Sequence, residues 1–390
     1  MGKKIAIVTS HPIQYYAPLF KLLAQGIDLN VFYTWGKDSV EKYDPGFGKK
    51  VQWDIPLLDG YSHQYLQNTS AEPGSHHFKG IKNPTIIKEL LDYNPSAIMV
   101  IGWGYHSHLK VLRYFKGKIP LYFRGDSTLL DNNNIGIKGK LQCLLRRIFL
   151  VWVYSHTDKA FYVGEESKAY FKWALLKETQ LVFSPHSIDN ARYEIDYSSK
   201  ANELRTSLSI SNSDRVILFA GKFENKKNSL LLLNAFISAS TINVHLLFIG
   251  NGDNETQLKL LAKESTKTSF IHFINFQNQS MMPIWYQLAD VFCLPSKGPG
   301  ETWGLAVNEA MASGKAIIAS TKVGCGKDLV KKNLNGWIFE SDNLEELREV
   351  IEKIPSKESL IKMGKESRRI IINWGIANTA NCILKEWKNI

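Results

Sequence analysis

The sequence lacks several features that would assign it to a specialised class of protein. Its four cysteines, in 390 residues, form neither close pairs nor metal-ligand spacings, which argues against a disulfide scaffold and a zinc module. No apolar run reaches the roughly 18 residues that a membrane-spanning helix needs. Arg146 and Arg147 interrupt the longest candidate, around residues 143–153. Internal repeats and low-complexity segments are also absent. These absences favour a cytoplasmic globular protein with reduced thiols.

The composition is that of a globular protein with an excess of positive charge. The residues are 44% hydrophobic and 22% charged, and the length suits two domains with ample cores. The first residues, MGKKIAIVTS, predict a strand rather than a signal peptide. The net charge of +11 indicates an anionic partner: a phosphorylated substrate, a membrane surface or nucleic acid. Because no RNA- or DNA-binding module is present, we expect no nucleic-acid partner.

Strands and helices alternate along both halves of the chain, which predicts two doubly wound parallel sheets. The expected domains are residues 1–195 and 205–372, with a boundary near 190–205 and a last helix within 373–390. Residues 36–80 predict long loops, and the polar residues 195–213 predict a surface connection. The buried runs that predict strands are Ile5–Ser10, Asp28–Trp35, Ala97–Ile101, Pro120–Asp126, Asp158–Val163, Val216–Gly221, Val244–Gly250, Phe270–Phe276, Asp290–Pro295 and Lys315–Ser320.

One stretch, SKGPGETWGLAVNEAMASG over Ser296–Gly314, combines the signals of a strand end, a glycine-rich loop and a helix. Gly314 is the expected stop of that helix. A loop that opens onto a helix N-terminus is an anion site, because free N–H groups and the helix dipole gather there. Two carboxylates, Glu301 and Glu309, flank it with seven residues between them. They are suited to accepting hydrogen bonds from sugar hydroxyls; the alternative is that both are solvated carboxylates at a helix start.

Upstream, Lys222 and Lys227 follow a predicted strand and can supply positive charge to a departing phosphate. The alternative for this pair is a solvated basic turn, since Lys226 lies between them. We find no D-x-D sequence at a strand end, so we expect no metal. The pair His76–His77 lacks further ligands at suitable spacing and is expected on the surface.

The stretch GETWGLAVNEAMASGKAIIAS resembles the E-x7-E motif of glycosyltransferase family 4, retaining enzymes of the GT-B fold. AGKFENKKN, FIGNG, WYQLADVFCLPS, VGCGKDLV and NGWIF are similar to further segments of that family, so the resemblance covers most of the carboxy-terminal half. It implies two Rossmann-like domains facing across a cleft, with the last helix crossing back to the first domain. It also implies a nucleotide-sugar donor, UDP- or GDP-linked, and no cofactor.

The resemblance assigns roles to individual residues. Glu301 would orient the donor sugar, with Lys222 and Lys227 on the diphosphate, and Asp126 would stand near the sugar where many members carry His. The other donor-binding residues would be Glu309 at the ribose, the helix start at Trp303, Gly304 and Leu305, the strand end at Gly250, and Phe276 and Gln277 at the nucleobase. The expected contacts on the acceptor side are His11, Gln14, Arg124 and His106. For the histidines, a loop cap or an exposed helix start is the alternative.

The sequence thus predicts a retaining glycosyltransferase that acts on a glycan or lipid-linked acceptor in bacterial surface polysaccharide synthesis. The alternatives are a nucleotide-sugar epimerase of similar fold and, on charge alone, a nucleic-acid-binding protein. Residues 101–150 contain nine basic side chains and only two acidic ones. The expected helix Lys138–Tyr154 is basic and amphipathic, which predicts peripheral contact with an anionic membrane. The alternative is that its apolar residues face the core.

Overall fold

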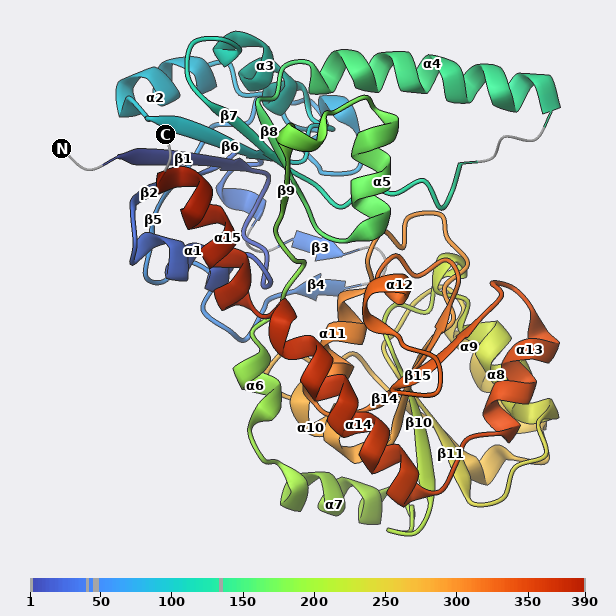
Figure 1. Cartoon of the computed structure of the whole chain (residues 1–390). Coiled ribbons are helices and arrows are strands. Elements are labelled where there is room, and N and C mark those ends of the chain that lie inside the picture. Colours follow the sequence, from blue (N-terminus) through green and yellow to red (C-terminus); the bar gives the residue numbers. More distant parts are fainter. Residues whose placement is uncertain (1–2, 40–41, 45–48, 133–135, 389–390) are drawn as a thin grey trace. The chain divides into compact units, whose positions relative to one another are not determined.

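The computed structural model describes residues 3–39, 42–44, 49–132 and 136–388 (Figure 1). The chain divides into two compact units. The first unit comprises Met1–Lys42, Ile55–His186 and Ile376–Ile390, and the second comprises Tyr43–Asp54 and Ser187–Gly375. The prediction had placed the boundary near residues 190–205, whereas these units divide a few residues earlier and assign Tyr43–Asp54 to the second.

The first unit is built on a seven-stranded parallel sheet in the order β5-β2-β1-β6-β7-β8-β9. Its strands are β1 (Lys4–Thr9), β2 (Asp28–Tyr33), β5 (Ser62–Tyr65), β6 (Ala97–Ile101), β7 (Leu121–Arg124), β8 (Lys159–Tyr162) and β9 (Leu181–Phe183). The short strands β3 (Lys42–Asp44) and β4 (Lys49–Val51) form a separate pair.

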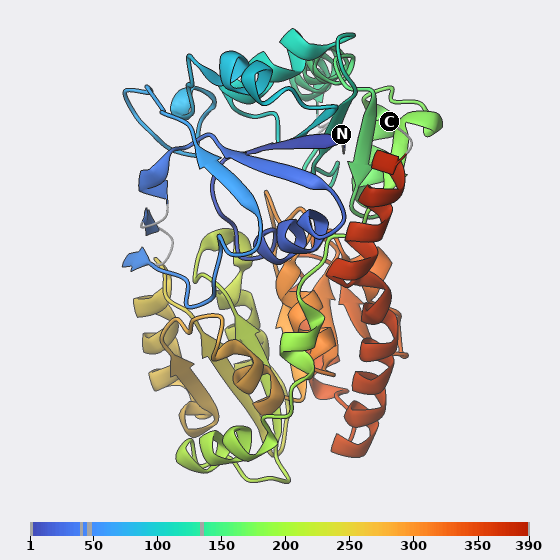
Figure 2. The same ribbon diagram turned by 90° about the vertical axis from the view of Figure 1, so that its left-hand side faces the viewer.

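Helices cover both faces of this sheet (Figure 2), because successive side chains of a strand point to opposite faces. On β1, Ala6 and Val8 join one core cluster, with residues of α2 (Ile86–Tyr93), α3 (His106–Phe115), α4 (Gly136–Tyr154) and α5 (Glu165–Trp173). Ile5 and Ile7 join the other, with residues of α1 (Ala17–Ala24) and α15 (Ile376–Lys388). The three short helices are η1 (Lys37–Ser39), η2 (Phe78–Gly80) and η3 (Glu178–Gln180).

The carboxy-terminal helix α15 belongs to the first unit although it follows the whole second unit in the chain. It packs against α1, and Ile383 and Trp387 are fully buried in the same core cluster as Ile5. Thr379 donates a hydrogen bond to the Pro185 carbonyl at 3.0 Å. The prediction that the last helix returns to the first domain is therefore confirmed.

The second unit is built on a six-stranded parallel sheet in the order β12-β11-β10-β13-β14-β15. Its strands are β10 (Arg215–Ala220), β11 (Val244–Ile249), β12 (Ile271–Ile274), β13 (Val291–Leu294), β14 (Ala316–Ser320) and β15 (Gly336–Phe339). Its helices are α6 (Asn190–Glu194), α7 (Ser198–Ser207), α8 (Ser229–Ser238), α9 (Glu255–Glu264), α10 (Met282–Leu288), α11 (Leu305–Ala312), α12 (Gly326–Leu329), α13 (Leu344–Glu352) and α14 (Lys357–Ile371), with short turns at η4 (Asn225–Lys227), η5 (Thr268–Phe270) and η6 (Ile372–Trp374). The predicted pair of doubly wound sheets is confirmed.

Two stretches predicted to lack regular structure contain elements. Within residues 36–80, β5 pairs with β2 at the sheet edge, although its sequence SHQY shows no apolar run. Within residues 195–213, α7 forms with only two buried residues, Ala201 and Arg205, and packs against α10. In both cases tertiary pairing stabilises an element that its own polar sequence does not signal.

Candidate functional site

The second unit has a topological switch point between β10 and β13. From β10 the chain proceeds to β11 and β12 on one side, and from β13 to β14 and β15 on the other. Ligands of open α/β sheets bind where the strand order reverses, at the carboxyl ends of the strands. The loops that follow these two strands meet there, since the Lys297 N–H donates to the Lys226 carbonyl at 2.9 Å.

An ion pair joins these two loops. Lys227, at the end of η4, places its Nζ 2.6 Å from Oε2 of Glu301. The Ser296 hydroxyl donates to the same carboxylate oxygen at 2.8 Å. The Glu301 side chain is only 7% exposed and that of Lys227 only 20%. Two side chains that the sequence assigned to a phosphate and to a sugar thus neutralise each other at the switch point.

Helix α11 begins beside this pair with a left-handed glycine. Gly304 has a φ of +97°, and a Cβ there would lie 2.9 Å from a Leu294 methyl and 3.0 Å from a Val323 methyl. Its position at the N-cap places the Leu305 and Ala306 N–H groups at the start of the helix, where intrahelical carbonyl partners are lacking, whereas the Val307 N–H donates to the Gly304 carbonyl at 2.9 Å. The helix ends at Ala312, and Gly314 follows with a φ of +72°, as predicted.

Glu309 and Trp303 are interior side chains. Glu309 is 4% exposed, and its Oε2 accepts a hydrogen bond from the Tyr286 hydroxyl at 2.8 Å. Trp303 is 3% exposed, its Nε1 donates to Asn308 at 2.9 Å, and its ring lies tilted against that of Trp374, with the ring centroids 5.2 Å apart. The alternative that both glutamates are solvated helix-start carboxylates is therefore wrong, because Glu301 and Glu309 are buried.

The remaining predicted donor residues lie at neighbouring strand ends of the same unit. Gly250 follows β11 with a φ of +145°, and a Cβ there would lie 2.0 Å from the Gly221 carbonyl oxygen. After β12, the Phe276 N–H donates to Asn251 at 2.9 Å, and the Gln277 side chain accepts from Trp285 Nε1 at 3.1 Å. Lys222, half-buried, follows β10.

In the first unit Arg124 is held by the protein itself. This side chain is 1% exposed, and its guanidinium donates to the Ser184 carbonyl and hydroxyl and to the Pro185 carbonyl, at 2.7–2.9 Å. It anchors the segment after β9, and its contact with an acceptor stays a prediction. Burial raises the pKa of the neighbouring Tyr16. The half-buried Asp126 adds to this shift, and Arg124 opposes it.

His186, which the sequence did not single out, belongs to the same cluster. Burial lowers its pKa to about 4, with Asp126 opposing and Arg124 adding to the shift. His11 lies in the loop after β1, 2.9 Å from the Ser10 hydroxyl and edge-on to Trp35. Gln14 is half-buried in the same loop. His106 does not join them, because it is exposed at the start of α3.

The described residues also bear on metal binding and on membrane spanning. Among the described residues, no group of three or more His, Cys, Asp or Glu side chains is arranged to hold a metal ion. The rings of His76 and His77, the pair that the sequence predicts on the surface, lie 4.7 Å apart. No helix in the described ranges is long and apolar enough to cross a membrane.

Comparison with known proteins gives a match for the second unit. Residues 200–373 match the family model described as Glycosyl transferases group 1. An uncharacterized glycosyltransferase of Haemophilus influenzae is 33% identical over 147 residues, which cover 37% of this chain and 39% of that protein. The lipopolysaccharide 1,2-N-acetylglucosaminetransferase of Salmonella typhimurium is 35% identical over 146 residues, 35% of this chain and 38% of that protein. The aligned part thus spans less than half the length of these relatives.

The structural comparison covers the whole chain. Anabaena HepE, solved in complex with UDP and glucose, matches with a TM-score of 0.72 and 16% identity, over 100% of both chains. The fold is GT-B. The Lys227–Glu301 pair therefore lies at the switch point of the second GT-B unit, within the segment that the family model matches.

Proposed function

We propose that the chain is a retaining glycosyltransferase of family 4 that transfers a sugar from a UDP- or GDP-linked donor. The observation that supports this most directly is the Lys227–Glu301 pair at the switch point, next to the start of α11. A cation, the first N–H groups of a helix and a carboxylate at two neighbouring strand ends suit a ligand that joins a diphosphate to a sugar. HepE, which shares the fold, binds UDP and glucose.

In the proposed reaction an acceptor hydroxyl bonds to the anomeric carbon of the sugar on the face that the diphosphate leaves, and the bond between the sugar and the diphosphate breaks. The hydroxyl proton passes to the departing phosphate, on which negative charge develops. Lys227 leaves Glu301 and, with Lys222 and the N–H groups at Leu305, stabilises that charge. Glu301 then accepts hydrogen bonds from sugar hydroxyls. Because these groups supply the compensating charge, the proposed reaction does not depend on a metal ion.

Other residues would hold the nucleoside. Glu309, oriented by Tyr286 at 2.8 Å, would accept hydrogen bonds from the ribose hydroxyls. The segment at Phe276 and Gln277 would contact the nucleobase, and Gly250 would let the donor approach the backbone. The enclosed indole of Trp303 leaves its backbone as the part suited to contact the donor.

The proposed acceptor is a glycan or a lipid-linked glycan of bacterial surface polysaccharide synthesis, reached at the cytoplasmic face of an anionic membrane. The Salmonella relative is, by its name, a lipopolysaccharide enzyme. Helix α4 carries no acidic residue, and its apolar residues Leu141, Leu145 and Ile148 are 54–59% exposed. The alternative that these residues face the core is wrong. Such a helix, with Lys138, Lys140 and Arg146 exposed along it, suits an interfacial position.

A panel of UDP, GDP, ADP and their sugars, tested in EDTA, examines the donor half of this proposal. A donor at a hundredfold excess over its Kd stabilises the protein by about 2.7 kcal/mol. We expect one nucleotide class to raise the melting temperature, and the transferred sugar to keep its anomeric configuration. Donor alone should not be epimerised. An inverted product, a requirement for Mn²⁺, or epimerisation without an acceptor would contradict the proposal.

A further inference from the structure

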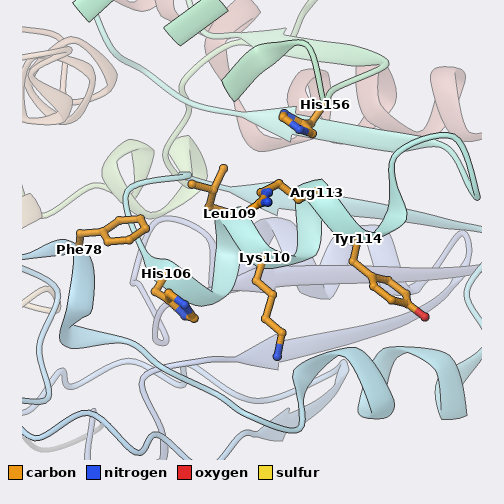
Figure 3. A pocket seen from close by; sticks show the side chains of 7 residues that line it. All are labelled: Phe78, His106, Leu109, Lys110, Arg113, Tyr114 and His156. Atoms are coloured by element: carbon orange, nitrogen blue, oxygen red, sulfur yellow. The ribbon is translucent and has the colours of Figure 1, made fainter. Parts of the chain in front are cut away.

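The first unit contains a pocket of about 630 Å³ that the proposed reaction does not use. It follows one face of α3, with one residue from η2 and one from the segment after α4 (Figure 3). The residues that line it are Phe78, His106, Leu109, Lys110, Arg113, Tyr114 and His156. The five from α3 have helical spacing, so they project from a single side of that helix.

The pocket is suited to an anion. Four of its lining side chains carry nitrogen donors, and none of the described residues that line it carries a carboxylate. Lys110 is fixed by a hydrogen bond to the Pro84 carbonyl at 3.2 Å. Burial lowers the pKa of His106, and Lys82 and Lys110 lower it further, so several positive charges act on this region.

The pocket is continuous with the exposed apolar face of α4. The Arg113 guanidinium lies over the Trp152 ring at 5.7 Å, and that ring meets His156 edge-on at 5.1 Å. From Trp152 the exposed apolar side chains continue towards the start of α4 at helical spacing: Phe149, Ile148, Leu145, Leu144, Leu141 and Ile137. Ile137 is 89% exposed, and Figure 1 shows α4 extending beyond the sheet of its unit.

We propose that this pocket binds the phosphate group of an anionic membrane lipid while the apolar face of α4 lies among the acyl chains. A pocket suited to an anion beside an apolar surface matches a lipid, because a lipid joins a phosphate group to apolar chains. The inference rests on the proposed membrane contact of the glycosyltransferase and adds a specific headgroup site. The proposed occupant is a lipid of the bilayer and not a second copy of the chain or a free phosphate.

The test compares three double variants of the full-length protein by flotation with vesicles of phosphatidylcholine alone or mixed with phosphatidylglycerol. Lys110→Ala/Arg113→Ala removes two positive charges from the pocket. Lys362→Ala/Lys365→Ala, at exposed positions of α14, removes the same charge elsewhere. Leu141→Ser/Leu145→Ser changes the apolar face at exposed sites that contribute little to folding. Circular dichroism checks that each variant is folded, and Lys110→Gln alone replaces the pocket variant if that variant unfolds.

We expect wild type to bind anionic vesicles, the α14 control to bind equally well, and the pocket variant to bind about 30-fold more weakly, since each basic residue at an anionic surface contributes about a factor of five. The leucine variant should also lose binding. Equal binding of pocket and control variants overturns the headgroup site. If the pocket variant loses binding of inorganic phosphate but keeps its binding to anionic vesicles, the pocket binds a free phosphate and the headgroup site is overturned. A wild-type dimer that dissociates in the leucine variant overturns it as well. UDP binding by wild type tests the catalytic proposal separately, so the two can fail independently.

Discussion

Breaking the Lys227–Glu301 pair from one side should destabilise the second unit. The carboxylate of Glu301 is only 7% exposed. In Lys227→Met it keeps the hydrogen bond from the Ser296 hydroxyl but loses its positive partner. Removing one member of a buried pair costs about 3–5 kcal/mol. The Lys227 side chain is 20% exposed, so water retains some access and we expect about 3 kcal/mol. For a unit of this size that lowers its melting temperature by about 6–12 °C.

A double-mutant cycle isolates the pair itself. Glu301→Gln, Lys227→Met and the double variant are unfolded in urea while tryptophan fluorescence is recorded. Because the double variant leaves no buried charge unpaired, it should recover about 2 kcal/mol of the summed losses, which appears as the coupling energy. A coupling energy within error of zero would refute the claim that these two groups compensate each other's charge. Lys353→Met, at the exposed residue that follows α13, removes one member of an exposed ion pair with Glu349 and serves as the matched control.

Further predictions concern three other sites. Tyr286→Phe removes the hydroxyl that donates a hydrogen bond to Glu309. The free energy of unfolding should fall by about 1 kcal/mol, and the KM for the donor should rise. An unchanged KM would argue against a donor role for Glu309. Gly250→Ala places a Cβ 2.0 Å from a carbonyl oxygen and should severely impair folding, while Gly104→Ala, with no described heavy atom within 4 Å of its Cβ, should be neutral in the same thermal unfolding assay. Burial lowers the pKa of His108 to about 4, so the unfolded chain binds its proton at higher pH than the folded one. The contribution to stability is complete above about pH 6.5 and is lost as the pH falls towards 4, by up to about 3 kcal/mol, and His108→Gln should flatten this pH dependence of unfolding.

Much of the fold was predictable because its strands are continuous apolar runs. Ala97–Ile101 was predicted with the bounds that β6 has, since both faces of a parallel sheet are covered and every residue is apolar. The sequence of β5 carries no such signal, because an edge strand needs no apolar run to pair with β2. The sequence also predicted α4 as a helix, but amphipathic periodicity alone does not tell which medium the apolar face contacts.

The candidate site was predictable residue by residue but not in its contacts. Lys227 and Glu301 were each assigned from local sequence, yet their pairing depends on β10 and β13 being neighbours, which only the sheet order establishes. The contacts of Arg124 could not be predicted for the same reason. Its strand-end position is typical of a ligand contact, while its partners Ser184 and Pro185 lie about 60 residues away in sequence. Long-range partners of buried charges are the part that local patterns do not encode.

Calorimetric titration of nucleotides into the protein in EDTA tests the central claim most directly. We expect that UDP or GDP binds, that the corresponding nucleoside binds more weakly, and that Lys227→Met weakens diphosphate binding at least tenfold (~1.4 kcal/mol) while leaving nucleoside binding unchanged. If neither diphosphate binds to wild type, or if Lys227→Met binds the diphosphate as tightly as wild type, the switch point of the second unit is not the donor site.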